Sequence, residues 1–152
     1  SQRFTSGILH TGSPLTDDDV ALQKSLTASS AAYRNAMDEC DISRGLEALS
    51  RHIVHCNGYA ERMEPWKLNK DPENKERVAI ILYHLAESLA HATVMISPVL
   101  PEAAAKLASQ LNFPGLIDLK ITDLRWGLLP DGHTIGTPQP VFPRILLEKA
   151  EA

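Results

Sequence analysis

The residues that could do chemistry gather in one stretch of the chain, residues 57–70. Within it, Trp66 directly follows Pro65 at the end of an amphipathic run, and Lys67 and Lys70 come just behind. An indole ring can stack on an unpaired nucleic-acid base, and such stacking contributes about 1–3 kcal/mol per base. An aromatic ring beside lysines is therefore suited to binding a single-stranded loop, with Pro65 and Trp66 placed off the helix.

Asn57 and Arg62 complete the set of candidate residues. The Asn57 amide offers a donor and an acceptor to a base edge, and Arg62 joins Lys67 and Lys70 as a candidate phosphate contact. The alternatives are a bond from Asn57 to backbone at a helix end and a solvated face for the cations. For Trp66 the alternative is a buried side chain that pins a loop. An exposed ring beside the lysines would favour RNA binding, and a buried one a protein scaffold.

Charge limits how such binding could work. The chain has 152 residues, is 43% hydrophobic and 22% charged, and so predicts one globular domain with room for a core. Its formal net charge of −4 argues against affinity from non-specific phosphate contacts, which grows with the number of phosphates neutralised. RNA binding must then be local, or use positive charge elsewhere in a larger protein, and no DNA partner is expected.

The sequence predicts neither a metal site nor a disulfide. Cys40 and Cys56 form no Cys-x-x-Cys pair and are expected to be small buried apolar residues. His84 and His91 lie seven residues apart, whereas helical metal-ligand pairs typically lie four apart. We expect both histidines to be partly buried polar side chains.

The sequence also indicates the cellular compartment in which the chain is expected. No apolar run reaches the roughly 18 residues that span a membrane, and no signal peptide is visible. These features predict a reducing, cytoplasmic setting without a membrane partner.

Periodicity predicts an all-α helical bundle of about four to five helices. The expected organisation is an irregular arm over 1–15, a helical bundle over 16–111, and a weak helix with an irregular or hairpin-like Gly/Pro-rich tail over 112–152. Within the bundle, helices are expected over about 17–38, 41–63, 71–96 and 101–111.

Caps and breaks set these boundaries. Thr16 and Asp41 are expected to cap the first two helices, and Pro65 to end the second, which places Pro65 and Trp66 on a turn. Apolar stripes predict that Ile53 and Leu85 are core residues joining the second and third helices. Tyr59 is expected to stack on the next helix with its hydroxyl in water.

The motifs of this chain resemble those of methionyl-tRNA synthetases. The run Asn57-Gly58-Tyr59, followed by Pro65-Trp66-Lys67-Leu68-Asn69-Lys70, is similar to the anticodon-reading segment of that family. The resemblance continues in Leu128-Leu129-Pro130-Asp131-Gly132 and in the run from Pro138 to Ile145, and covers nearly the whole chain. It implies a helical anticodon-binding domain that recognises the CAU anticodon of methionine tRNA, with Trp66 against the first base, a cytosine.

The resemblance also implies what lies outside the chain. The family signatures His-Ile-Gly-His and Lys-Met-Ser-Lys-Ser are absent, so we expect no catalytic residue and no cofactor here. ATP and methionine would be used by a catalytic domain acting in cis. In the family, a further helix with an Asn-Leu run and an Arg helps to read the anticodon, and Ser1–Phe4 looks like its end. The alternatives are the anticodon-binding domain of a sibling class I synthetase and a helical protein-interaction scaffold.

Overall fold

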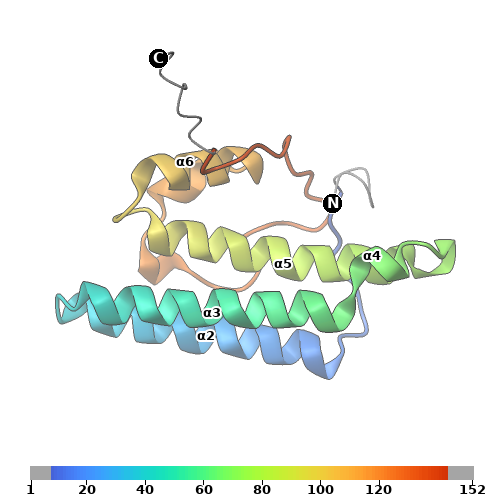
Figure 1. Cartoon of the computed structure of the whole chain (residues 1–152), viewed down its shortest axis with the longest axis horizontal. Coiled ribbons are helices and arrows are strands. Elements are labelled where there is room, and N and C mark those ends of the chain that lie inside the picture. The colour runs from blue at the N-terminus through green and yellow to red at the C-terminus, as the bar shows by residue number, and fades with distance from the viewer. Residues whose placement is uncertain (1–7, 144–152) are drawn as a thin grey trace, which may run out of the picture.

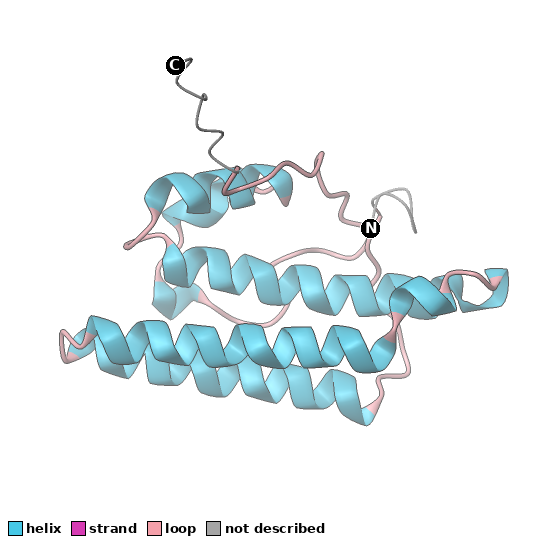
Figure 2. Cartoon of the chain, in the orientation of Figure 1, coloured by secondary structure: helices cyan, strands magenta, loops and turns pink. Residues whose placement is uncertain are grey.

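The computed structural model describes residues 8–143, and these form helices without a strand (Figure 1, Figure 2). The α-helices are α2 (Asp17–Asp38), α3 (Ile42–Met63), α4 (Pro65–Leu68), α5 (Lys75–Ile96) and α6 (Pro101–Gln110). Three 3-10 segments are η1 (Pro72–Asn74), η2 (Pro114–Asp118) and η3 (Ile121–Asp123). The all-α prediction is confirmed, and α2 and α3 lie side by side with α5 and then α6 stacked on them (Figure 1).

Both predicted helix caps are present. The Thr16 hydroxyl accepts from the Asp19 backbone N–H, and the Asp19 carboxylate accepts from the Thr16 N–H at 2.8 Å, which forms a capping box. Asp41 caps α3 by accepting from the Arg44 N–H at 3.0 Å. These side chains satisfy backbone donors that a helix start leaves unpaired, so the first two helices begin where the sequence predicts.

α5 is the central helix of the bundle. Together with η1 it forms a stretch, Pro72–Ile96, that is long and apolar enough by composition to cross a membrane. Of its most apolar window, 72% is buried inside the protein. That burial is what the core helix of a bundle requires, because its neighbours cover it on most sides.

The predicted core is wrong at Ile53. This side chain is 45% exposed, and the neighbouring His52 is fully buried instead. Successive residues on a helix differ by about 100° in direction, so a contact face shifted by one residue exchanges the two positions. Leu85 is partly buried against the cluster formed by Leu22, Tyr59 and Ile81, as its stripe predicted.

The two cysteines differ from each other. Both are free thiols, and Cys56 is partly buried. Cys40 is exposed, which corrects the prediction of burial. It occupies the loop between α2 and α3 with a left-handed φ of 57°, where the chain reverses direction outside the helical faces.

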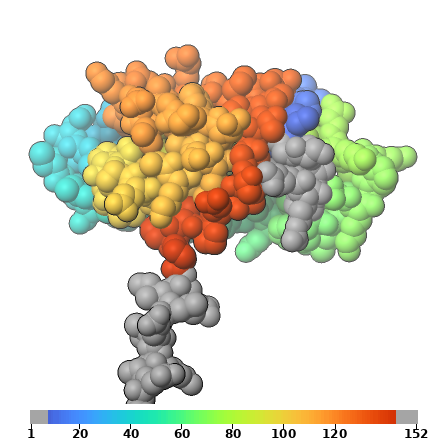
Figure 3. Space-filling model, turned by 90° about the horizontal axis from the view of Figure 1, so that it is seen from above, coloured from blue at the N-terminus to red at the C-terminus, as the bar shows by residue number. Residues whose placement is uncertain are grey.

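The tail beyond η3 runs extended along the bundle and meets the N-terminal arm. The Leu9 N–H donates to the His133 carbonyl at 2.9 Å, and the Gly132 N–H donates to the Leu9 carbonyl at 2.8 Å. Leu9 itself is fully buried. The arm, expected to be irregular, therefore anchors the tail, whose red end lies beside the yellow and orange α6 in Figure 3.

Candidate RNA-binding site

The candidate site is built on the junction between α3 and α4. Glu64 closes α3, with its N–H donating to the Ala60 carbonyl at 3.0 Å, and opens α4, with its carbonyl accepting from the Lys67 N–H at 2.8 Å. Its φ of 42° and ψ of 54° are left-handed, a conformation that costs a non-glycine residue about 1–2 kcal/mol. Pro65 then takes the first position of α4, where its missing N–H is tolerated.

This geometry confirms that the second helix ends before Pro65 and corrects the prediction that Pro65 and Trp66 lie on a turn. The second helix does end before Pro65, but Pro65 and Trp66 lie in a short helix and not on a turn. The left-handed residue redirects the chain, so that helical geometry resumes at once. The proline therefore begins a helix here as well as preventing the extension of the previous one.

α4 orients Trp66 toward solvent. Pro65 is buried, and Leu68, one turn later, packs against the cluster of Leu22, Tyr59 and Ile81. Trp66 lies between these two anchors and is 47% exposed. An exposed ring beside lysines is what RNA binding requires, whereas a structural pin buried under a helix would hide the ring.

The three cations near Trp66 are not equally available. Arg62 Nε lies 2.8 Å from Asp18 Oδ1, and Lys67 Nζ lies 2.6 Å from Glu64 Oε1. Lys70 is exposed and forms no ion pair with any residue from 8 to 143. Exposed ion pairs contribute about 0–1 kcal/mol, so Arg62 and Lys67 can exchange their carboxylates for phosphate at little cost.

Asn57 is also available. Its side chain is exposed, and within the described residues its amide makes no hydrogen bond. The alternative of a bond to nearby backbone is thus not what the structure shows. Asn57 precedes Glu64 by seven residues, which places it two turns back on the same face of α3 as the α3–α4 junction.

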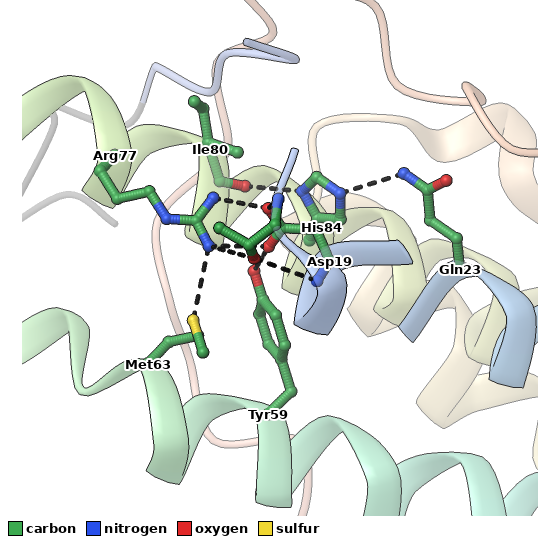
Figure 4. A network of polar contacts seen from close by, with 8 residues as sticks. Asp19, Gln23, Tyr59, Met63, Arg77, Ile80 and His84 are labelled. Carbon is green, nitrogen blue, oxygen red and sulfur yellow. Dashed lines mark hydrogen bonds and ion pairs between the residues drawn. The ribbon is translucent and has the colours of Figure 1, made fainter. Parts of the chain in front are cut away.

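A buried polar network lies beneath this junction (Figure 4). Asp19, from the first turn of α2, accepts from Tyr59 Oη at 2.6 Å and from Arg77 Nη1 and Nη2 at 2.6 and 2.9 Å. Arg77 Nη2 also donates to the sulfur of Met63, the last residue of α3, at 3.4 Å. The network therefore joins α2, α5 and the end of α3 from which α4 starts. It corrects the expectation for Tyr59, whose hydroxyl is buried and bonded.

The network holds a charge inside the protein. Burial by itself raises the pKa of Asp19, but hydrogen bonds from Arg77, Tyr59 and Thr16 outweigh it and hold that pKa well below its usual range. Burial, followed by the bond to Asp19, raises the pKa of the Tyr59 hydroxyl above its ordinary value. Tyr59 consequently stays a donor and Asp19 an ionised acceptor at neutral pH.

Asp19 and Arg77 were not among the residues predicted from the sequence for this site. The only local signal for Asp19 is its place three residues after Thr16 in a capping box. Its partners lie 40 and 58 residues away, at positions that no helical periodicity links to it. Their role in supporting the junction becomes visible only when the helices pack.

His84 and His91 are more deeply buried than expected, and different partners hold them. His84 Nδ1 lies 2.9 Å from the Ile80 carbonyl, while its Nε2 lies 3.1 Å from the Gln23 amide nitrogen. The carbonyl requires a proton on Nδ1, so Nε2 accepts from Gln23. His91 Nε2 lies 3.2 Å from Glu87 Oε1. The two rings therefore have separate structural partners.

A family model described as the anticodon binding domain of methionyl tRNA ligase matches residues 9–152 of this chain. The chain belongs to this family. This match confirms the resemblance to methionyl-tRNA synthetases that the motifs indicated. It excludes the alternative of an anticodon-binding domain from a sibling class I synthetase.

Individual relatives agree with the family model. The chain is 34% identical over 151 residues to the methionine–tRNA ligase of Streptomyces coelicolor, covering 94% of this chain and 28% of that protein. It is 35% identical over 113 residues to the enzyme of Fusobacterium nucleatum, covering 73% of this chain and 18% of the relative. The chain thus spans less than a third of the length of these curated relatives.

A solved structure shows the same fold. The apo form of Mycobacterium tuberculosis methionyl-tRNA synthetase superposes with a TM-score of 0.83 at 25% sequence identity. The match covers 96% of this chain and 29% of that one. The helical arrangement of this anticodon-binding domain is therefore shared with a methionyl-tRNA synthetase.

Proposed function

We propose that residues 1–152 form one recognition domain that binds the CAU anticodon loop of methionine tRNA. It would act in cis with a cytoplasmic catalytic domain that uses ATP and methionine. The observation that carries the proposal is the 47% exposed Trp66, held on α4 by buried Pro65 in a chain of the anticodon-binding family. A scaffold that buried this ring would not present it in this way.

Different side chains of the site would make different kinds of contact with the RNA. Trp66 stacks on the first anticodon base, which supplies affinity without sequence preference. The free Asn57 amide supplies hydrogen bonds to a base edge, and Lys70, with Arg62 and Lys67 after they leave their carboxylates, contacts phosphates. Binding energy gained at the anticodon can then position the distant acceptor end for aminoacylation.

The central test is Trp66→Ala in the full-length synthetase. Loss of stacking should lower kcat/KM for aminoacylation of methionine tRNA by about 5- to 150-fold, equivalent to about 1–3 kcal/mol. Methionine-dependent ATP–pyrophosphate exchange should stay unchanged, because adenylate formation does not use this domain. The melting temperature should also stay close to that of the wild type, since the ring is half exposed.

Trp66→Phe is the matched control, because it keeps an aromatic face and should retain most of the charging activity. A Trp66→Ala enzyme that charges tRNA normally but melts many degrees lower would show that Trp66 is a structural pin, and the proposal would fail.

A further inference from the structure

We propose that the cleft between α2 and the segment from η3 to Trp126 binds a small oxyanion attached to an aromatic body, of the size of a mononucleotide. The cleft has a volume of about 400 Å³. Binding sites for small molecules typically have volumes of about 300–1,000 Å³, with apolar walls and a few convergent polar groups. This cleft shares no residue with the α3–α4 junction, so the inference does not depend on the proposed function.

The charge of the cleft points to an anion. Arg34, from α2, and Arg125, from the tail, both line it, and none of its described lining residues is an Asp or a Glu. Neither guanidinium forms an ion pair with a residue in the described part of the chain, although the protein carries a net charge of −4. Guanidinium groups present planar, paired donors that match the geometry of phosphate and carboxylate oxygens.

Two residues of the cleft lining carry buried polar atoms that have no hydrogen-bond partner among the described residues. His91 is 3% exposed and lines the cleft, and its Nδ1 has no hydrogen-bond partner. Its Nε2 faces two acceptors, Glu87 Oε1 at 3.2 Å and the Arg125 carbonyl at 3.1 Å, so Nε2 carries the proton and Nδ1 accepts. Ser30 Oγ, on the same lining, is likewise buried and unpaired.

The ligand must match both the charge and the wall of the cleft. His91 Nδ1 and Ser30 Oγ are enclosed behind the lining, so the arginines and the apolar wall decide which ligand fits. A simple inorganic anion satisfies the arginines but supplies no apolar body. A nucleoside phosphate carries both features.

The remaining wall is apolar and fixed in place. Leu26 and Leu124 line it together with Trp126. The Trp126 ring packs against His84, with centroids 5.0 Å apart, and edge-on against Tyr83, at 6.2 Å. A ring held by two others offers a rigid surface for an aromatic ligand at a low cost in conformational entropy.

The test titrates this chain with uridine monophosphate, uridine and inorganic phosphate, followed by calorimetry and by amide chemical shifts. We expect saturable one-to-one binding of the nucleotide, with both parts weaker by about tenfold or more. Arg34→Gln and Arg125→Gln should each weaken nucleotide binding by about tenfold, because each removes a charge-assisted hydrogen bond. Arg51→Gln, an exposed arginine of α3 outside the cleft, is the matched control and should change nothing.

Three outcomes would overturn the proposal. The first is no saturable nucleotide binding at about 10 mM, a concentration at which even millimolar affinity would be visible. The second is equal weakening by all three arginine substitutions, which indicates general charge attraction. The third is a stem-loop RNA that loses affinity with Arg125→Gln while the mononucleotide does not bind, which assigns the arginines to an RNA surface. Trp66→Ala should leave nucleotide binding unchanged, so failure here and failure of anticodon binding can be told apart.

Discussion

Asp19 and Glu87 both carry fully buried carboxylates, yet their partners are of different kinds. Apart from the Thr16 N–H of its capping box, Asp19 is bound by side chains, the Arg77 guanidinium and the Tyr59 hydroxyl, which come from two other helices. Glu87 is bound mainly by backbone, since it accepts from the N–H groups of Gly127, Leu128 and Leu129 at 2.7–2.9 Å. Asp19 thus joins helix to helix, and Glu87 joins an irregular segment to the central helix.

The difference follows from whether the backbone groups of each region find hydrogen-bond partners within that region. Helices satisfy their own backbone groups, so a buried charge between them serves to fix their relative positions. The tail has no ladder or helix over residues 127–129, so its N–H groups, of which that of Leu129 is buried, take an acceptor from outside the segment. At Glu87, burial by itself raises the pKa, but bonds from His91 and from the tail backbone outweigh it and lower that pKa. The carboxylate therefore stays ionised as an acceptor.

The largest expected effect is that of Glu87→Ala, at about 3–5 kcal/mol of unfolding free energy. It removes the acceptor for three backbone donors, of which the Leu129 N–H is buried and would be left without a partner. Denaturant unfolding measures the loss, and hydrogen exchange at 127–129 should accelerate first. Glu87→Gln keeps one acceptor oxygen and should lose less. Equal losses in both variants would show that packing, and not acceptance, is what Glu87 contributes.

Unlike these two carboxylates, buried His52 has no charged partner within the described residues, and it should make the unfolding free energy depend on pH. Burial, followed by the proximity of His91, lowers the pKa of His52 from 6.5 to about 4. Between these values the unfolded state binds more protons than the native state, so the unfolding free energy should fall as the pH decreases from 6.5 to 4. The fall attributable to fully buried His52 is about 3 kcal/mol.

Urea unfolding at a series of pH values tests this slope. His52→Leu should make it shallower without abolishing it, because burial also lowers the pKa of His84. His55→Gln should reduce the slope only slightly, because His55 contributes less than burial to the lowered pKa of His52. A His52→Leu protein with the wild-type slope would contradict the assignment.

Asp19→Ala should cost about 2–3 kcal/mol, less than Glu87→Ala. The Arg77 side chain is 23% exposed and can reach water once its partner is removed, although the Tyr59 hydroxyl cannot. Thermal melting measures the loss, and the emission of Trp66, recorded in a Trp126→Phe background, reports whether α4 shifts when the network is broken.

Asp18→Ala is the control for Asp19→Ala, and it has the smallest expected effect on the unfolding free energy. Asp18 lies 2.8 Å from Arg62, but this pair is exposed, and Asp18→Ala should change stability by less than about 1 kcal/mol. Similar losses for Asp18→Ala and Asp19→Ala would mean that burial does not distinguish the two acids.

Helix positions and the family could be predicted from the sequence because their causes are local. Thr16 and Asp41 cap helices through residues three positions away, and Pro65 ends α3 through its own ring. The Pro65-Trp66 motif carries the resemblance to the anticodon-binding family, which the comparisons confirm. These features depend on near neighbours in the chain, and the printed sequence contains them.

Tertiary packing alone decided which faces are buried and which buried groups meet. His52 is buried and Ile53 is half exposed, although periodicity favoured the reverse, because the contact angle of α3 with its neighbours sets the buried face. Asp19 with Arg77, and Glu87 with the tail, are pairs separated by 40 to 58 residues, and no spacing rule links them. Long-range electrostatic partners are chosen by the packing of whole helices, which is why the support beneath Trp66 could not be predicted while the exposure of Trp66 could.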